Sequence, residues 1–287
     1  MSKIRFLYIT LLVLIAVPTL AQAPQNWVHP KTPWDDPDLQ GIWPGNVGVP
    51  MQRPQNMGER TTLTDEEFAQ RLAQAKRQAE ADSQSIATSD MRVGIGPPSY
   101  WTERGRPTRQ TSLIIDPPNG RLPPLTPEAE KYRKEARGGK GLPGEWRGEA
   151  DSYDDLNIYY RCITRGLLGS VTLFMGDSRG HWEGNTLVVE TTNFTDKDAI
   201  GSNGAGYPGD PGYHSDQLKI IERFTRVSDD RLEYRATVID DKTWTRPWTI
   251  LIELERNNNY QLLEYACHEG NYAMEDILSG ARATDKK

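Results

Sequence analysis

The second half of the chain alternates apolar and polar residues along a series of short segments, and this pattern constrains the fold most. The segments cover residues 186–194, 216–227, 231–240, 245–256 and 262–267, and turns rich in Gly, Asn, Asp and Ser separate them. A period of two residues is typical of a β-strand with one buried face. Sequential strands with short turns favour an antiparallel up-and-down meander. Closure into a calycin-like barrel, or packing as a sandwich, would remove the exposed strand edges. We therefore predict a mainly β fold.

The first half of the mature chain, residues 22–157, predicts a proline-rich wrap around this meander. Residues 37–43 resemble a turn followed by a short strand, and residues 111–116 predict a further strand. The β-meander should occupy residues 158–287 and end in a short helix over 273–283 that caps it. We expect the wrap and the meander to form one structural domain.

Two helices are predicted in the wrap from their N-terminal signals. Thr64 and Glu67 have the spacing of a capping box, which predicts a helix from about residue 65 to 82. Thr126 followed by Pro127 predicts the start of a second helix that ends by the Gly138-Gly139 pair.

The N-terminus has the three zones of a secretory signal peptide. Lys3 and Arg5 precede an apolar run over residues 6–20, and small residues follow, including Ala21. We place cleavage after Ala21, so that residues 1–21 are removed. The alternative, a membrane anchor, would need about 20 apolar residues. Because no later segment reaches that length, we expect a soluble mature protein in the periplasm or outside the cell.

The net charge limits the classes of binding partner, and the cysteine content indicates a possible disulfide. The net charge of −6 and the lack of a basic stripe argue against binding nucleic acid. The chain has two cysteines, Cys162 and Cys267, and in an exported protein such a pair is a disulfide candidate. The alternative is two buried thiols. Oligomeric state is not predicted.

Several motifs resemble those of a large family of exported bacterial proteins of unknown function. They are Asp38-Leu-Gln-Gly-Ile-Trp43, Pro98-Ser-Tyr-Trp-Thr-Glu-Arg-Gly105, Arg109-Gln-Thr-Ser-Leu-Ile-Ile-Asp-Pro-Pro118, Arg161-Cys-Ile-Thr-Arg-Gly166, Gly176-Asp-Ser-Arg-Gly-His-Trp-Glu-Gly184 and Glu264-Tyr-Ala-Cys-His-Glu-Gly-Asn-Tyr272. The resemblance implies a calycin-like fold, and Gly41-Ile-Trp43 is similar to the Gly-x-Trp entry strand of lipocalins. It implies no particular activity.

The chain departs from this family after Gly166. Relatives have some tens of residues before the segment that begins at Gly176, whereas only residues 167–175 intervene here. The insert resembles two or three further strands. Its loss predicts a barrel that is smaller or open on one side.

Acid–base chemistry is one candidate function, centred on His268. Neighbouring residues of a strand point to opposite faces, so packing of Cys267 would turn His268 into the barrel interior. Glu269 lies beside it in sequence, and His181 with Asp177 is a second His and carboxylate pair. Histidine titrates near neutral pH, which suits a general acid or base. The alternative is a structural His268 at a turn formed by residues 270–272.

No resident metal or other cofactor is predicted. His181, His214 and His268, with or without Glu269, have the side chains to hold zinc or copper. No metal-ligand spacing such as HxH or HExxH supports such a site. Scattered structural histidines are the favoured interpretation.

Binding of a small molecule is the leading prediction. The candidate ligand-binding residues are Tyr160, Arg161, Arg179, Trp182, His214, Trp248 and Tyr272. Trp244 and Trp248 lie four residues apart and would share a strand face, as a stacking platform or as core. We expect an apolar or aromatic ligand. The alternatives are a secreted lyase, isomerase or hydrolase in the same pocket, or a module that binds carbohydrate or the cell envelope.

Overall fold

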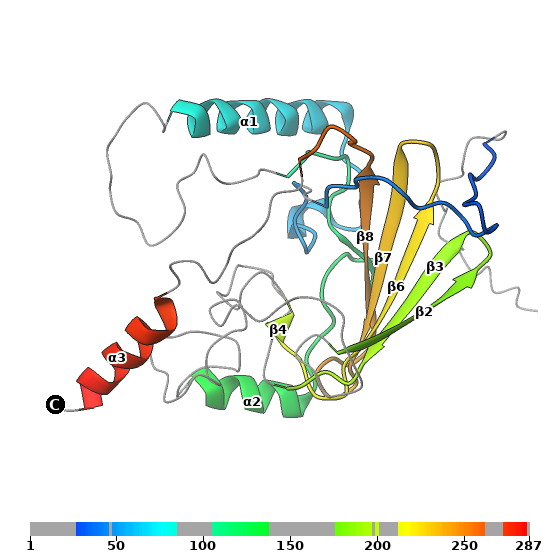
Figure 1. The fold of residues 1–287 in the computed structure, drawn as a ribbon. Helices are drawn as coiled ribbons and strands as arrows, with labels where there is room; N and C mark the ends of the chain where they lie inside the picture. Colours follow the sequence, from blue (N-terminus) through cyan, green and yellow to red (C-terminus); the bar gives the residue numbers. More distant parts are fainter. Residues whose placement is uncertain are drawn as a thin grey trace, which may run out of the picture.

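A six-stranded antiparallel sheet dominates the computed structural model of the protein (Figure 1). The structure describes residues 27–45, 48–84, 105–137, 176–196, 199–200, 212–261 and 272–285. The strands are β1 (Ile114–Asp116), β2 (Asp177–Glu183), β3 (Thr186–Thr192), β6 (Lys219–Arg226), β7 (Arg231–Ile239) and β8 (Trp248–Glu255), in the order β1-β8-β7-β6-β3-β2. Strands β4 (Ala199–Ile200) and β5 (Gly212–Tyr213) form a separate small pair.

The predicted antiparallel meander is confirmed. From β2 to β8, each strand of the large sheet pairs antiparallel with the next strand of that sheet along the chain. Strand β1 joins the far edge by pairing with β8, so the N-terminal half contributes to the same sheet. Within the described residues the sheet is open, with β1 and β2 at its two edges. The predicted strand over 262–267 lies outside the described residues, and barrel closure stays a prediction.

Strand β2 precedes the first segment in which alternation predicts a strand, so the sequence pattern missed it. Its residues pair with β3 in register, from Asp177 opposite Thr192 to Glu183 opposite Thr186. The error has a physical reason: charged residues and Gly180 have low strand propensity, but an edge strand tolerates charge because one side stays exposed. A turn at Gly184, which has a φ of 58°, joins β2 to β3.

The chain over residues 37–43 forms no described strand, which corrects an expectation from the sequence. Gly41 has a φ of 144°, and the indole N–H of Trp43 donates to the Leu39 carbonyl at 3.0 Å. These features curl the chain back on itself. Its backbone link to the sheet is the N–H of Asn257, which donates to the Ile42 carbonyl at 2.9 Å.

The predicted helices are present as α1 (Asp65–Gln84), α2 (Pro127–Arg137) and α3 (Ala273–Asp285), with a short 3₁₀ turn over Gln55–Met57. The capping box is confirmed: the Thr64 N–H donates to Glu67 Oε2 at 2.9 Å, and the Glu67 N–H donates to Thr64 Oγ1 at 3.2 Å. Thr126 caps α2 by accepting from the Ala129 N–H at 3.1 Å. Helices α1 and α2 lie toward opposite ends of the strands (Figure 1).

The core lies on one face of the sheet, which we call the core face. Its buried cluster contains Ile114, Phe194, Leu218, Val238, Trp244 and Trp248. Trp244 and Trp248 pack edge to face, with ring centroids 5.6 Å apart. Full burial of a large apolar side chain contributes about 2–3 kcal/mol, so this pair is a major part of the core. Of the two interpretations of these tryptophans, core packing is confirmed.

Asp240 ties the loop after β7 to the segment before β6. Its carboxylate is buried and accepts from the N–H and hydroxyl of Ser215, each at 2.7 Å. It also accepts from the Thr243 hydroxyl at 2.7 Å and from the N–H groups of Thr243 and Lys242 at 3.1 and 3.2 Å. Ser215 Oγ in turn accepts from the Gln217 N–H at 3.1 Å.

The predicted signal peptide, Cys162 and Cys267 lie outside the described residues. The helices that the structure describes include none with the length and apolar character required to cross a membrane.

Candidate functional site

Three of the four sequence-predicted residues of strand β2 lie on its polar face, and the fourth, Trp182, lies on the core face. Asp177, Arg179 and His181 alternate along the strand, and Arg179 Nη2 donates to Asp177 Oδ2 at 3.2 Å in a local ion pair. His181 Nε2 lies 3.2 Å from Glu183 Oε1, with 53% of its side chain exposed. Arg223 of β6 pairs closely with Glu183, and this contact, followed by that of His181, lowers the pKa of Glu183. These residues form a charged surface rather than an enclosed acid–base site.

The other predicted site residues that the structure describes do not converge. His214 is buried, with Nδ1 3.0 Å from the Ser215 carbonyl and its ring edge-on to Phe194 at 5.8 Å. Trp248 is only 1% exposed, so it is part of the core, whereas Tyr272 is 68% exposed. Tyr160, Arg161, His268 and Glu269 lie outside the described residues, so the acid–base hypothesis stays a prediction.

A metal site formed by three or more His, Cys, Asp or Glu side chains is not found within the described ranges. His181 and His214 differ fundamentally in environment, since one is exposed on an edge strand and the other is buried beside the core. The remaining histidine of the hypothetical set, His268, is outside these ranges.

A groove on the polar face, which we call the arginine groove, was missed by the sequence analysis. It runs along β6 and β7 from the turns that end β2 and β6, and it has a volume of about 580 Å³. This volume lies within the usual range for a small-molecule site. Its lining residues are Trp27, His29, Asn185, Thr186, Arg223, Thr225, Arg226, Val227, Glu233 and Arg235.

Arg223 and Arg235 lie directly opposite each other across β6 and β7 and both line the groove. Like charges in this position are destabilising in the absence of counter-charges. Among the described residues each guanidinium has one carboxylate partner: Arg223 pairs with Glu183, and Arg235 Nη2 donates to Glu233 Oε2 at 2.9 Å. Since a guanidinium has five N–H donors, both side chains retain donors for an anionic group in the groove.

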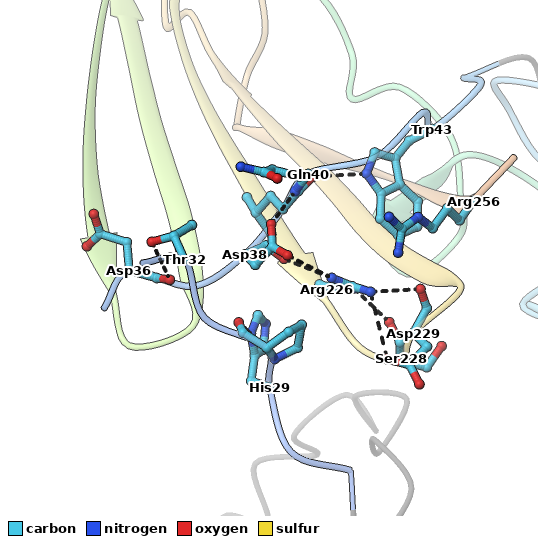
Figure 2. A network of polar contacts seen from close by, with 12 residues as sticks. His29, Thr32, Asp36, Asp38, Gln40, Trp43, Arg226, Ser228, Asp229 and Arg256 are labelled. Atoms are coloured by element: carbon cyan, nitrogen blue, oxygen red, sulfur yellow. Dashed lines mark hydrogen bonds and ion pairs between the residues drawn. The ribbon is translucent and has the colours of Figure 1, made fainter. Parts of the chain in front are cut away.

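Arg226 holds the N-terminal segment that forms one wall of this groove. We call residues 27–45 the strap. Figure 2 shows Arg226 between Asp38 of the strap and the turn at Ser228 and Asp229. Its N–H groups donate to the carbonyls of Asp38, Ser228 and Asp229 at 3.1, 3.1 and 2.9 Å, and its side chain is 4% exposed. Arg226 is therefore a structural anchor rather than an open anion contact.

The strap also places aromatic rings beside the arginines. The Trp27 indole N–H donates to Asp229 Oδ1 at 3.3 Å, and its ring meets that of His29 edge to face at 4.8 Å. Farther along the strap, the guanidinium groups of Arg226 and Arg256 lie 5.8 and 5.9 Å from the Trp43 ring centre (Figure 2). Such cation–π contacts help to hold the strap against the sheet.

Glu233 has an unusual environment at the groove. The residue is 5% exposed, and Arg235 occupies only its Oε2. Glu233 Oε1 and His29 Nε2 are both buried, and neither has a hydrogen-bond partner among the residues that the structure describes. Both residues line the groove.

A row of apolar side chains crosses the core face away from the buried cluster. Trp182, Leu187, Phe224, Tyr234 and Ile252 are neighbours in register on five consecutive strands. Trp182 is 36% exposed, and the Tyr234 hydroxyl donates to Glu222 Oε1 at 2.7 Å. Burial, followed by the charge of Glu222, raises the pKa of Tyr234, which keeps the phenol protonated.

Comparisons with protein-family models, curated proteins and solved structures find no match for this chain. The site therefore has to be interpreted from its own geometry.

Proposed function

We propose that the protein binds a small aromatic molecule with an anionic group in the arginine groove. The observation that carries this proposal is the pair formed by Arg223 and Arg235, two like charges side by side in a groove of about 580 Å³. Such a pair adds nothing to stability by itself. It suits recognition of a carboxylate or a similar group, because guanidinium groups bind planar anions through paired hydrogen bonds.

We infer the aromatic part of the ligand from the wall of the groove that the strap forms. Trp27 lines the groove, and its indole supplies a flat apolar surface next to the arginines. This sharpens the expected apolar or aromatic ligand into one with an acid group.

The test is a titration of the mature protein with aromatic acids and their neutral amides, such as phenylacetate and phenylacetamide, followed by Trp fluorescence and calorimetry. The acid should bind at least ten times more tightly than the amide. Arg223→Ala and Arg235→Ala should each weaken acid binding by tenfold or more. Arg231→Ala is the matched control, because Arg231 also lies on β7 and pairs with Glu253 at 2.9 Å but does not line the groove. Equal binding of acid and amide would overturn the proposal.

We also propose that the sheet belongs to a calycin-like barrel with the row from Trp182 to Ile252 on its inner face. Support comes from the meander order and from the shared face of the row and the buried core. This arrangement puts the arginine groove on the outer face of the same sheet. The N-terminal charge and apolar pattern supports a place of action in the periplasm or outside the cell.

A further inference from the structure

We infer that the ligand of the arginine groove carries, besides its acid group, an O–H or N–H donor that hydrogen-bonds to Glu233. This inference rests on the proposed function and names the ligand class more closely. Glu233 is 5% exposed and lines the groove, and its Oε1 has no donor within the part of the chain that the structure describes.

An acceptor in this state is energetically costly. More than about nine in ten buried polar groups in folded proteins have a partner. A buried acceptor without one costs about 1–3 kcal/mol, and more when it is charged. A donor on a bound ligand would remove this cost, so the binding energy would depend on that donor.

His29 provides a second acceptor at the same groove. Its Nδ1 lies 3.1 Å from the Pro30 carbonyl, which can only accept, so Nδ1 holds the ring proton. In the neutral ring Nε2 is then an acceptor, and it too is buried without a partner among the described residues. Two acceptors at the groove, one on the strap and one on β7, therefore both lack a donor among the described residues.

The two contacts lie close together. Glu233 and Arg235 project from the same face of β7, and Arg235 Nη2 donates to Glu233 Oε2 at 2.9 Å. The inferred ligand is thus an aromatic acid that also carries a hydroxyl or amino group.

The experiment measures the affinity of three probes for the mature protein by calorimetry at neutral pH: phenylacetate, 4-hydroxyphenylacetate and 4-methoxyphenylacetate. The hydroxyl compound donates, the methoxy compound can only accept, and phenylacetate does neither. The wild-type protein should bind 4-hydroxyphenylacetate at least ten times more tightly than 4-methoxyphenylacetate.

Glu233→Gln should abolish or reverse this preference. Arg235 would donate to the remaining amide oxygen, so the amide NH₂ would take the place of the unpartnered oxygen and present donors to the ligand. Glu253→Gln is the matched control, because Glu253 lies opposite Glu233 on β8 and does not line the groove. This control should keep the wild-type preference.

The outcomes separate the two proposals. Equal affinities of the wild-type protein for all three acids would overturn the inference and leave the arginine groove as an anion site. The comparison of the three acids with the wild-type protein alone can overturn the inference. The test therefore remains valid even if the Glu233→Gln protein does not fold. Failure of all three acids to bind would overturn the proposed function together with the inference.

Discussion

Strand β7 has a buried carboxylate near each of its ends, and the two differ in how they are satisfied. Asp240 follows the strand and accepts five hydrogen bonds from Ser215, Lys242 and Thr243. Glu233 lies near the start of the strand and, within the described part of the chain, accepts one hydrogen bond, from Arg235, while its other oxygen has no partner there. A fully satisfied buried carboxylate organises loops, whereas a half-satisfied one beside a groove indicates a site that a ligand completes.

Replacement of Asp240 by Asn tests the structural end of this comparison and should have the largest effect. Either orientation of the amide puts its NH₂ against a backbone N–H, because Ser215 donates to one oxygen and Lys242 and Thr243 donate to the other. We expect the free energy of unfolding to fall by about 3–5 kcal/mol in urea titrations. Asp241→Asn, at the exposed neighbouring position, is the control and should change it by less than about 0.5 kcal/mol. Similar values for both variants would contradict the structural role.

Replacement of Arg226 by Ala tests whether this side chain holds the strap against the sheet. The change leaves the carbonyls of Asp38, Ser228 and Asp229 without their donor. We expect a loss of about 2–3 kcal/mol and faster hydrogen exchange over residues 27–43. Arg256→Ala removes the exposed neighbour on Trp43 and should leave that exchange nearly unchanged. Protection of the strap in Arg226→Ala would show that other contacts hold it.

The sequence predicts the local parts of both carboxylate sites but not their completion. The alternation of apolar and polar residues predicts β6 and β7. A turn centred on Asp229 then places Arg223 opposite Arg235, so this pair could have been predicted from the sequence. The groove wall could not, because Trp27 reaches the site through contacts with residues some 200 positions away, such as Asp229. A contact of this kind leaves no periodic pattern in the sequence.

The same distinction explains the two errors in the fold. Strand β2 was missed because its polar face carries Asp177, Arg179 and His181, which an edge strand can expose but propensity disfavours. The expected strand near Trp43 is absent from the described residues because the indole bonds locally to Leu39. Helix starts were correct because caps at Thr64 and Thr126 depend on neighbours in sequence.

Glu233→Gln tests the functional end of the comparison and should barely change stability. The single donor that Glu233 accepts can still donate to the amide oxygen, and the change removes a buried charge that is only half satisfied. We expect the free energy of unfolding to change by less than about 1 kcal/mol, in contrast to Asp240→Asn. A loss as large as that of Asp240→Asn would show that Glu233 is structural after all.

Glu67 extends the comparison between satisfied and half-satisfied carboxylates to the surface, where we expect the smallest effect. Its carboxylate accepts from Arg60 Nη1 and Nη2 at 2.7 and 2.8 Å and from the Thr64 N–H at 2.9 Å, so it is well satisfied although exposed. Arg60, followed by the Thr64 N–H, lowers the pKa of Glu67 from 4.5 to about 2. Since the folded pKa is the lower one, its contribution is complete above pH 4.5 and is lost as the pH falls toward 2. Carboxyl titration by NMR should show this midpoint, and Arg60→Gln should move it back up while the fold stays intact. A midpoint near 4.5 in the wild-type protein would mean that the capping box and the Arg60 pair are open in solution. Hydrogen bonds would then fix a carboxylate only where it is buried, as at Asp240.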